Sequence, residues 1–467
     1  MTARKNLRRV LLAALLCVLL AATALANEVD TPETAVNKLE SAVENRESSF
    51  YVHLPDGTPA LRQQFNAAIQ GHILETESWT DVSPRVTLAL DNNTTMRVEL
   101  RYAEGQERYA AALDAAYDAC IREKMSSREK AASIYSYLSE HVQRAAGCDT
   151  ACEALVEGRA DSFGFAAAFR ALAQKAGLTC AVVHTTVRAW NTVTLKSGTY
   201  YVDASCAGEK GVPGQVGFQY LLFGSGTLTG YEAPAEKPEV SAADCELGFS
   251  RYAVCTPLML TEDGFWLIRG NEYGNRLYAA PYGTNFKEQT PLMTLTGATF
   301  SNAVQAAVMA DGVVYYTLSQ QNDTFLYSWT PGMGAAEARE TGLTGNYGLR
   351  LEGGTLSLVQ DGAAVKAMPL RQYAFAEPGV CYARDAGVPL AEAEMRLLNA
   401  APDGAVIAAF YSAAGQMLRV QSFDAAGSFR LGAIPGGCAM VRLFTVGTAG
   451  QPRAAALPIA ISADAIR

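Results

Sequence analysis

The hydrophobic pattern of the sequence changes period at Gly177, and this change limits the folds that the chain can adopt. Helical signals dominate residues 107–176, where breakers are few and apolar residues recur at helical spacing. From residue 178 to residue 205 the pattern becomes that of short strands. Helices followed by antiparallel strands predict an α+β unit in this part of the chain.

Local signals set the boundaries of these elements. Ser126 and Glu129 stand three residues apart and form a capping box, which predicts the start of a helix. Gly177 suits the position directly after the end of the next helix. Three strands are predicted to follow, at residues 178–184, 189–195 and 199–205.

The first 26 residues have the features of a secretory signal peptide. A basic start is followed by an apolar run from Val10, and Ala24 and Ala26 fit the small-residue rule for cleavage. An uncleaved anchor is the alternative, although the run is at the short limit for a membrane span. Leu16 disfavours lipidation of Cys17. We therefore expect cleavage after Ala26 and a secreted, extracellular or cell-surface protein.

The mature chain is expected to be strongly acidic. The full chain has a formal net charge of −9, and loss of the four basic residues of the signal peptide leaves −13. Such a surface repels polyanions, so we expect no nucleic-acid partner. No later stretch is long and apolar enough to cross a membrane, so we expect no stable span after cleavage.

Nine cysteines remain in the mature chain, at irregular spacings. An exported location permits disulfides, but the spacings define no pairing, and the odd number leaves at least one thiol over. His141, Cys148 and Cys152 do not complete a set of four ligands, so we expect no metal site and no cofactor.

The second half of the chain has β signals alone. Asp263-Gly264 and Asp311-Gly312 begin similar strand-like runs about 48 residues apart, and Gly353-Gly354 begins a fainter third run. A period of this length is typical of propeller blades, but three copies are too few for a closed propeller, so an irregular meander is the alternative. Strands separated by glycine-bearing turns predict an immunoglobulin-like sandwich after residue 370.

Residues 155–205 carry the pattern of a site for nucleophilic catalysis. Ser162 stands at a predicted helix N-terminus, where free N–H groups and a partial positive charge activate a nucleophile. A base on the next strand and a carboxylate on the strand after it would complete a triad. A predicted helix and two predicted strands occur here in that order.

The motifs around these positions resemble the transglutaminase-like family, a branch of the papain-like cysteine proteases that is common in secreted multidomain bacterial proteins. The resemblance spans residues 101–230 and implies a papain-like α+β domain there. It implies that Ser162 replaces the nucleophilic cysteine, that Arg188 replaces the base histidine, and that Asp203 keeps the place of the orienting acid. The matching pieces are Leu155-x-x-Gly158, Ser162-x-Gly164-Phe165-Ala166, Arg188-Ala189-Trp190-Asn191 and Tyr200-Tyr201-Val202-Asp203.

These substitutions predict an inactive site. A serine hydroxyl needs a base, and a guanidinium stays protonated at any workable pH. We expect Arg188 and Asp203 to form an ion pair across neighbouring strands instead. Phe163, Trp190 and Asn191 are the candidate binding residues of the groove, with core packing as the alternative for Trp190.

Other residues could still supply chemistry to this site. His184, Asp161 or Asp203 could act as the base. Cys152 or Cys180 could be a displaced nucleophile, although a structural role suits both thiols better.

The expected fold class is therefore multidomain α+β, in which a transglutaminase-like domain precedes all-β modules. We interpret the chain as an exported pseudoenzyme that binds a peptide, a protein or a cell-wall glycan. The alternatives are an active hydrolase or acyltransferase that uses Ser162 with an unconventional base, and a spacer whose β modules perform the recognition. The predicted segments are a signal peptide at 1–26, an α/β lead-in at 27–100, the transglutaminase-like domain at 101–230, a linker at 231–245, β-repeats at 246–370 and the sandwich at 371–467.

Overall fold

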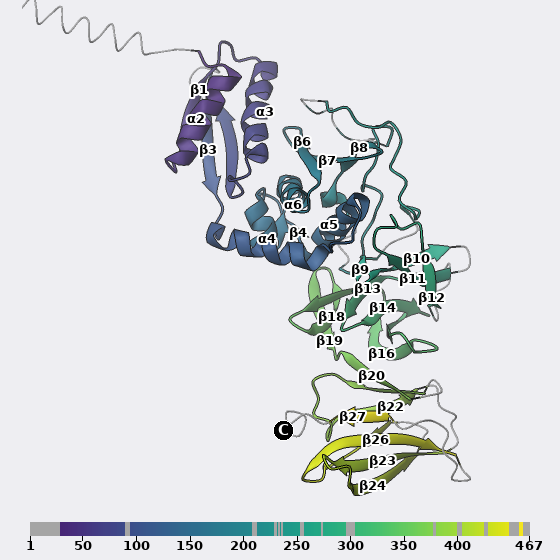
Figure 1. Cartoon of the computed structure of the whole chain (residues 1–467). Coiled ribbons are helices and arrows are strands. Elements are labelled where there is room, and N and C mark those ends of the chain that lie inside the picture. Colours follow the sequence, from purple (N-terminus) through teal and green to yellow (C-terminus); the bar gives the residue numbers. More distant parts are fainter. Residues whose placement is uncertain are drawn as a thin grey trace, which may run out of the picture. The chain divides into compact units, whose positions relative to one another are not determined.

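The structure is a computed structural model, and Figure 1 shows its elements. The predicted signal peptide lies outside the described residues. The chain divides into two compact units: residues 1–123, 130–205 and 220–245 form the first, and residues 124–129, 206–219 and 246–467 form the second. The described residues are 29–88, 94–207, 213–227, 231, 234, 237–252, 256–271, 274–295, 304–376, 380–398, 404–424, 428–447 and 457–460.

The expected fold class is wrong. Strands make up 40% of the structure and helices 23%, and antiparallel sheets recur along the whole chain. An α+β papain-like domain therefore does not open this protein. The helical signals between residues 107 and 176 are locally strong. The predicted fold class therefore gave too little weight to the strands before and after them. Within the described ranges, no helix combines the length and the apolarity that crossing a membrane requires.

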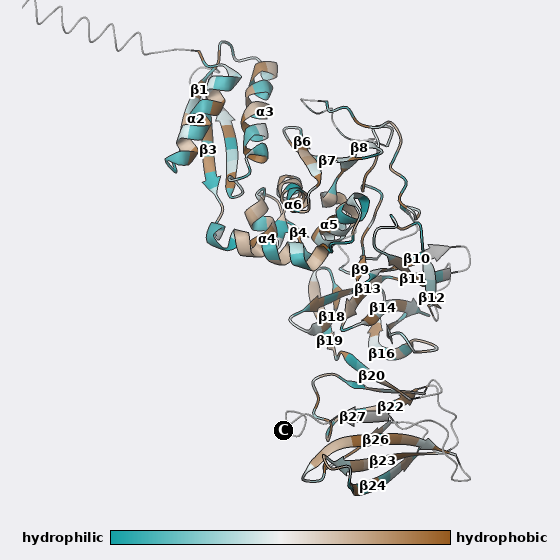
Figure 2. Cartoon of the chain, viewed as in Figure 1, coloured by the Kyte–Doolittle hydropathy of each residue, from teal (hydrophilic) through white to brown (hydrophobic). Residues whose placement is uncertain are grey.

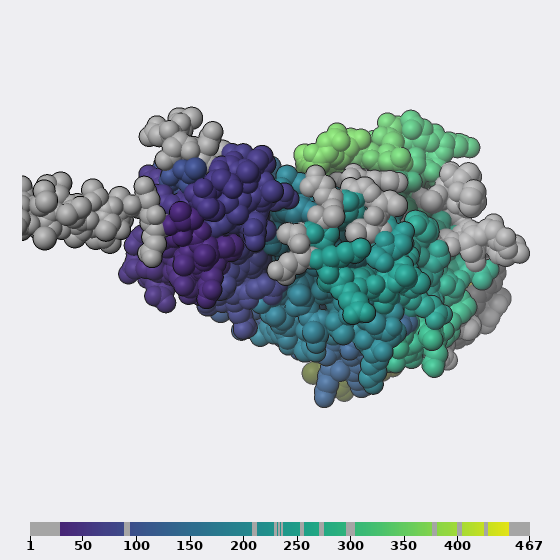
Figure 3. Space-filling model, turned by 90° about the horizontal axis from the view of Figure 1, so that it is seen from above, coloured from purple at the N-terminus to yellow at the C-terminus, as the bar shows by residue number. Residues whose placement is uncertain are grey.

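A small sheet with two helices comes first in the chain. The antiparallel strands β1 (Ser49–His53), β3 (Thr95–Tyr102) and β2 (Val82–Leu88) lie in that order. The helices α2 (Pro32–Glu44) and α3 (Pro59–Glu75) both begin with proline, whose fixed φ suits the first helical position. Apolar residues of both helices and the sheet share one core. In Figure 3 these purple residues form a closely packed body.

The rest of the first unit holds the predicted helices and the three-stranded antiparallel sheet β6–β7–β8. The predicted strands at 178–184, 189–195 and 199–205 are confirmed to within a few residues. The elements are α4 (Gln106–Cys120), α5 (Ser127–His141), β4 (Gln143–Arg144), the π-helix η1 (Glu153–Glu157), β5 (Arg159–Ala160), α6 (Ser162–Lys175), β6 (Thr179–His184), β7 (Ala189–Leu195), β8 (Gly198–Val202) and the short helix η2 (Ala204–Cys206).

Three antiparallel meander sheets follow in the second unit. The predicted copies begin equivalent strands, because β10 starts at Gly264, β14 directly after Gly312 and β18 directly after Gly354, and each is the second strand of its sheet. The described residues hold three such sheets, fewer than the four blades of a closed propeller. The strands are β9 (Met259–Leu260), β10 (Gly264–Asn271), β11 (Gly274–Pro281) and β12 (Thr290–Thr294); β13 (Ala306–Ala310), β14 (Val313–Gln320), β15 (Asp323–Trp329) and β16 (Glu337–Thr344); β17 (Gly348–Glu352), β18 (Thr355–Gln360) and β19 (Ala363–Met368).

Apolar side chains pack these sheets against one another. One core joins the first two sheets and includes Ile268, Tyr316 and Trp329. A second core joins the second and third sheets and includes Tyr315 and Leu358. Because β14 contributes to both cores, most of its length is buried, and its apolar character is visible in Figure 2.

The last part of the chain is a β-sandwich of two four-stranded antiparallel sheets. Their inner faces share a core that includes Tyr382, Met395, Phe410 and Leu443. One sheet has the order β20 (Arg371–Ala376), β21 (Val380–Asp385), β22 (Glu394–Leu398), β25 (Ser428–Arg430), and the other has the order β24 (Met417–Asp424), β23 (Ala405–Ser412), β26 (Cys438–Val446), β27 (Leu457–Ala460).

Candidate functional site

Ser162 is the first residue of α6, as the sequence predicts. Asp161 caps this helix, and its Oδ1 accepts hydrogen bonds from the backbone N–H groups of Phe163 at 2.9 Å and Gly164 at 3.3 Å. Ser162 is 8% exposed, and its Oγ accepts a hydrogen bond from the backbone N–H of Ala189 at 3.4 Å. The serine thus connects the start of α6 to the start of β7.

Gly164 is required by packing at the same helix end. A Cβ atom at this position would lie 2.6 Å from the carbonyl oxygen of Cys148 and 3.1 Å from that of Thr150. The first contact is shorter than real Cβ atoms show and the second is tighter than most, so a side chain would force the backbone apart. This glycine of the motif therefore has a structural reason that is independent of chemistry at Ser162.

Arg188 and Asp203 form the predicted ion pair. Arg188 directly precedes β7 and Asp203 directly follows β8, which are adjacent antiparallel strands. The Nε and Nη2 atoms of Arg188 lie 3.1 Å and 2.6 Å from Oδ2 of Asp203. The carboxylate is deeply buried, whereas 30% of the Arg188 side chain is exposed.

Two further residues donate hydrogen bonds to the Asp203 carboxylate. The Tyr231 hydroxyl donates to Oδ2 at 2.8 Å, and its ring lies 4.4 Å from the Arg188 guanidinium carbon. Ser205 donates to Oδ1 from its backbone N–H at 3.1 Å and from its hydroxyl at 2.6 Å. Tyr231 comes from the stretch predicted to be a linker, residues 231–245, which belongs to the first unit.

The three candidate binding residues are placed differently. Trp190 is 1% exposed and meets the rings of Tyr201 and Tyr231 edge to face, with ring centroids 6.3 Å and 5.1 Å away. Asn191 is fully buried, and its Nδ2 donates to the carbonyl oxygen of Ala166 in α6 at 2.9 Å. Phe163 is half-buried. Trp190 and Asn191 therefore hold β7 in the core, and Phe163 is the nearest to solvent of the three.

The two alternative nucleophiles are buried thiols. Burial raises the pKa of Cys152 to about 11, and its Sγ donates to the carbonyl oxygen of Glu104 at 3.5 Å. Burial also raises the pKa of Cys180 far above its ordinary value. Because the thiolate is the reactive form, both cysteines are unreactive at neutral pH.

The alternative bases have other surroundings. The Nε2 atom of His184 lies 3.2 Å from where a Cβ on Gly71 would be, so the imidazole packs against α3. Burial, together with the charge of Asp149, raises the pKa of Asp161 to about 6, although the N–H groups at the start of α6 oppose this rise. Asp161 is engaged as the cap of the helix.

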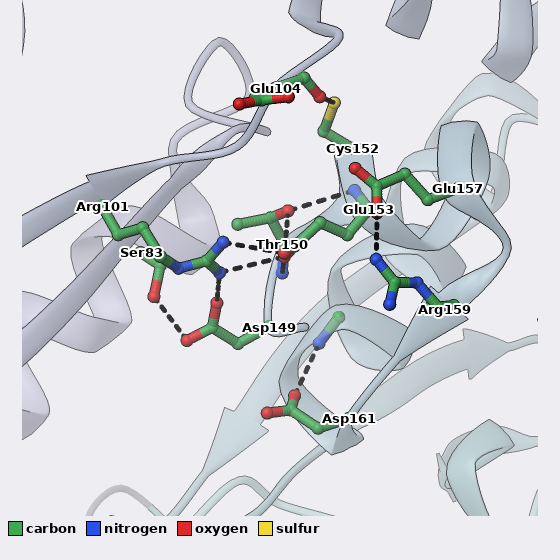
Figure 4. Close-up of polar contacts among 11 residues, drawn as sticks. Ser83, Arg101, Glu104, Asp149, Thr150, Cys152, Glu153, Glu157, Arg159 and Asp161 are labelled. Carbon is green, nitrogen blue, oxygen red and sulfur yellow. Dashed lines mark hydrogen bonds and ion pairs between the residues drawn. The ribbon is translucent and has the colours of Figure 1, made fainter. Parts of the chain in front are cut away.

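A polar cluster near Asp161 fastens the first sheet to the chain before α6, as Figure 4 shows. Arg101 on β3 contacts Oδ1 of Asp149 at 2.5 Å and the Glu153 carboxylate at 2.7 Å and 3.0 Å, and the Ser83 hydroxyl donates to Asp149. Burial alone would raise the pKa of Glu153, but the hydrogen bond from Arg101 holds it below its ordinary value. The sequence analysis missed this cluster, which joins residues about 50 positions apart.

Potential metal ligands are not clustered in the described residues. In the part of the chain that it describes, no group of three or more His, Cys, Asp and Glu side chains is placed to hold an ion. His141 stacks on the Tyr137 ring, with centroids 4.1 Å apart, and Cys148 is buried.

Comparisons with known proteins identify no family. The chain matches no family model and no curated protein. One similar solved structure is the extracellular domain of a proposed hybrid two-component system from B. thetaiotaomicron, at 10% identity with a TM-score of 0.17. The match covers 60% of this chain and 44% of that one, so the chain spans less than half of its length. A likeness this weak supports no conclusion about fold or function.

Proposed function

We propose that the chain is an exported binding protein whose Ser162–Arg188–Asp203 site does not turn over substrate. The observation that carries this proposal is the engagement of Asp203. Its two carboxylate oxygens accept hydrogen bonds from Arg188, Tyr231 and Ser205. In a working triad this acid orients a base that can take up a proton, and Arg188 stands where that base is needed but keeps its own proton.

The surroundings of Ser162 support the same conclusion. A serine attacks only after a base removes its proton. The Ser162 hydroxyl accepts from the Ala189 amide, and the guanidinium of the neighbouring Arg188 is bonded to Asp203 and cannot act as a base. Its contact is that of a residue that joins a helix to a strand.

The ligand class in this proposal is a peptide, a protein or a cell-wall glycan. Export rests on the signal-peptide pattern of residues 1–26, and descent from a transglutaminase-like enzyme rests on the motif residues around Ser162, Arg188 and Asp203. Export and descent from such an enzyme are both parts of the proposal.

The test compares the wild type with Ser162→Ala on peptide and glutamine-donor substrates. We expect no turnover by either protein, since a positioned base typically contributes about 10²–10⁴-fold in rate and the site provides none. Ser197→Ala, on an exposed turn of the same sheet, is the matched control. Wild-type turnover that Ser162→Ala abolishes and Ser197→Ala preserves would show that the serine is catalytic.

A double variant tests the proposed origin of the site. Ser162→Cys with Arg188→His rebuilds the residue types of a thiol triad with Asp203. Turnover by this variant, absent from Ser162→Cys alone, is expected if the site descends from such an enzyme. Thermal unfolding of each variant shows that a negative result does not come from loss of the fold.

A further inference from the structure

We infer that a cavity in the first unit, distinct from the Ser162 site, binds a small organic ammonium ion with an apolar body. This inference rests on the proposed binding function and deepens it by giving that function a site and a ligand class. The cavity has a volume of about 380 Å³, within the range of sites for small ligands. It is bordered by the end of α3, residues 76–82, α4, the turn at 149–151 and one face of α6.

The size of the cavity follows from small side chains on α6. Ala167 and Ala171 stand one helical turn apart and line it, and both are partly exposed. Larger residues at these two positions would occupy the space. The lining also includes Ile73 and Leu74 at the end of α3, which add apolar surface.

Two aromatic residues contribute to the wall. Trp79 is half-buried, and its ring meets that of His72 edge to face with centroids 5.3 Å apart. Tyr109 on α4 is 8% exposed, and its hydroxyl has no hydrogen-bond partner among the described residues. Aromatic rings attract cations, and pairs of them recognise organic ammonium groups in known sites.

Three of the charged residues that line the cavity have partners within the protein. Asp149 is paired with Arg101, and Lys175 with Asp114 at 2.7 Å. Arg170 donates to the carbonyl oxygens of Leu74 and Glu75, at 2.6 Å each, and its Nε lies 3.4 Å from the Glu75 carboxylate, so its charge is paired with the end of α3.

Glu77 is the exception among these lining residues. Its side chain is exposed, and the described part of the chain contains no hydrogen-bond or ion-pair partner for its carboxylate. It lines the same cavity as Trp79 and Tyr109. The uncompensated charge at the cavity is therefore negative.

This combination selects the charge and shape of the ligand. A carboxylate beside two aromatic rings attracts an ammonium group, and the apolar lining holds the body attached to it. The net charge of the chain, −9, favours the approach of cations over anions. A carboxylate ligand of the same size would be repelled by Glu77.

Calorimetric titration of the full chain tests the ligand class. The cationic probes are benzylammonium, hexylammonium and benzyltrimethylammonium, and the matched uncharged and anionic probes are benzyl alcohol and benzoate. We expect at least one cationic probe to bind tenfold or more tightly than both matched probes. The inference would be overturned if benzyl alcohol bound as tightly as the cationic probes, or if none of the three cations bound at millimolar concentration.

Two substitutions test the location. Glu77→Gln is expected to weaken binding of the cation at least fivefold, whereas Glu44→Gln, on the exposed side of α2, leaves it unchanged. Ala171→Leu fills the cavity and is expected to abolish binding, whereas Ala111→Leu, on the exposed side of α4, does not. Thermal unfolding shows that each variant is folded, and cation binding that survives both cavity substitutions would contradict the site.

The titration and the turnover assay separate the two proposals. Binding of the cation is expected to be the same in Ser162→Ala as in the wild type. Turnover lost in Ser162→Ala would refute the proposed function and leave the cavity result standing. Absence of cation binding would refute the cavity and leave the Ser162 result standing.

Discussion

The two units of the chain each contain a cluster of an arginine, a carboxylate and a tyrosine. In the first unit Arg188, Asp203 and Tyr231 meet, with the tyrosine hydroxyl 2.8 Å from the carboxylate. In the second unit Arg371 and Tyr373 meet Glu337, with a corresponding distance of 2.9 Å. The shortest arginine–carboxylate distance is 2.6 Å in both.

The clusters differ in geometry and burial. Arg371 reaches both oxygens of Glu337, and these side chains are 8% and 2% exposed. Arg188 directs both donors to one oxygen of Asp203, and 30% of its side chain is exposed. The Glu337 cluster joins β16 to β20, at a place where no catalytic motif is predicted. The comparison supports a structural role for Arg188 as well.

The largest effect is expected from Arg371→Met. This change leaves the buried Glu337 without its main partner, which typically costs about 3–5 kcal/mol of unfolding free energy. The measurement is urea unfolding of the full chain, fitted with separate transitions if the units unfold separately. The control Arg430→Met removes an exposed arginine 3.7 Å from Glu394 and is expected to cost about 1 kcal/mol or less. A loss for Arg371→Met no larger than that of the control would contradict the comparison.

An intermediate effect is expected from Arg188→Met. Solvent reaches this arginine, and Tyr231 and Ser205 still donate to Asp203, so we expect a loss of about 1.5–3 kcal/mol in the same unfolding experiment. Arg97→Met, which removes an exposed pair with Glu99 in the same unit, is the control. If Arg188→Met destabilises the chain as much as Arg371→Met does, exposure does not distinguish the clusters.

The smallest effect concerns pH and has opposite signs in the two units. Burial alone would raise the pKa of Glu337, but Arg371 holds it below its ordinary value, so its contribution to stability is lost as pH falls below about 4.3. Burial raises the pKa of Asp161 to about 6, so the stability that its protonated form contributes is lost as pH rises from about 4 to 6.

Unfolding midpoints between pH 3.5 and 7 check both signs. The asparagine in the Asp161→Asn variant still caps the helix, so the stability of this variant relative to the wild type is expected to increase as pH rises. Glu337→Gln is expected to be less stable than the wild type at neutral pH, and this difference is expected to shrink as pH falls. Asp424→Asn, at an exposed position on β24, is the control. If the midpoints of the wild type and Asp161→Asn change with pH in parallel, the ionisation of the buried Asp161 does not affect stability.

Local signals predicted much of the structure. The capping box is present, with the Ser126 N–H 2.9 Å from the Glu129 carboxylate and the Glu129 N–H 3.3 Å from the Ser126 hydroxyl. Ser162 at the start of α6, the hairpin between β7 and β8, and the equivalent strands after Gly264 and Gly312 also follow from short-range patterns.

The other structural features depend on weak local signals or on contacts between residues that are far apart in the sequence. The lead-in at 27–100 was expected to be α/β, but the positions of α2 and α3 were not predicted, although Thr31-Pro32 and Thr58-Pro59 are typical helix starts. Tyr231 reaches Asp203 from 28 residues away and Arg101 reaches Glu153 from 52 residues away, and no local pattern specifies such contacts. The cavity beside Glu77 combines several separate segments, so only the folded chain reveals it.

Gly164 bears on how motifs are used to infer ancestry and activity. The carbonyl oxygen of Cys148 leaves no room for a Cβ atom there, whatever residue stands at position 162. Natural selection for folding alone is therefore enough to keep this glycine in a lineage, even one in which no reaction takes place. A motif search that gives weight to this glycine therefore detects a shared fold. The residues that can exchange protons must be scored separately if activity is to be inferred.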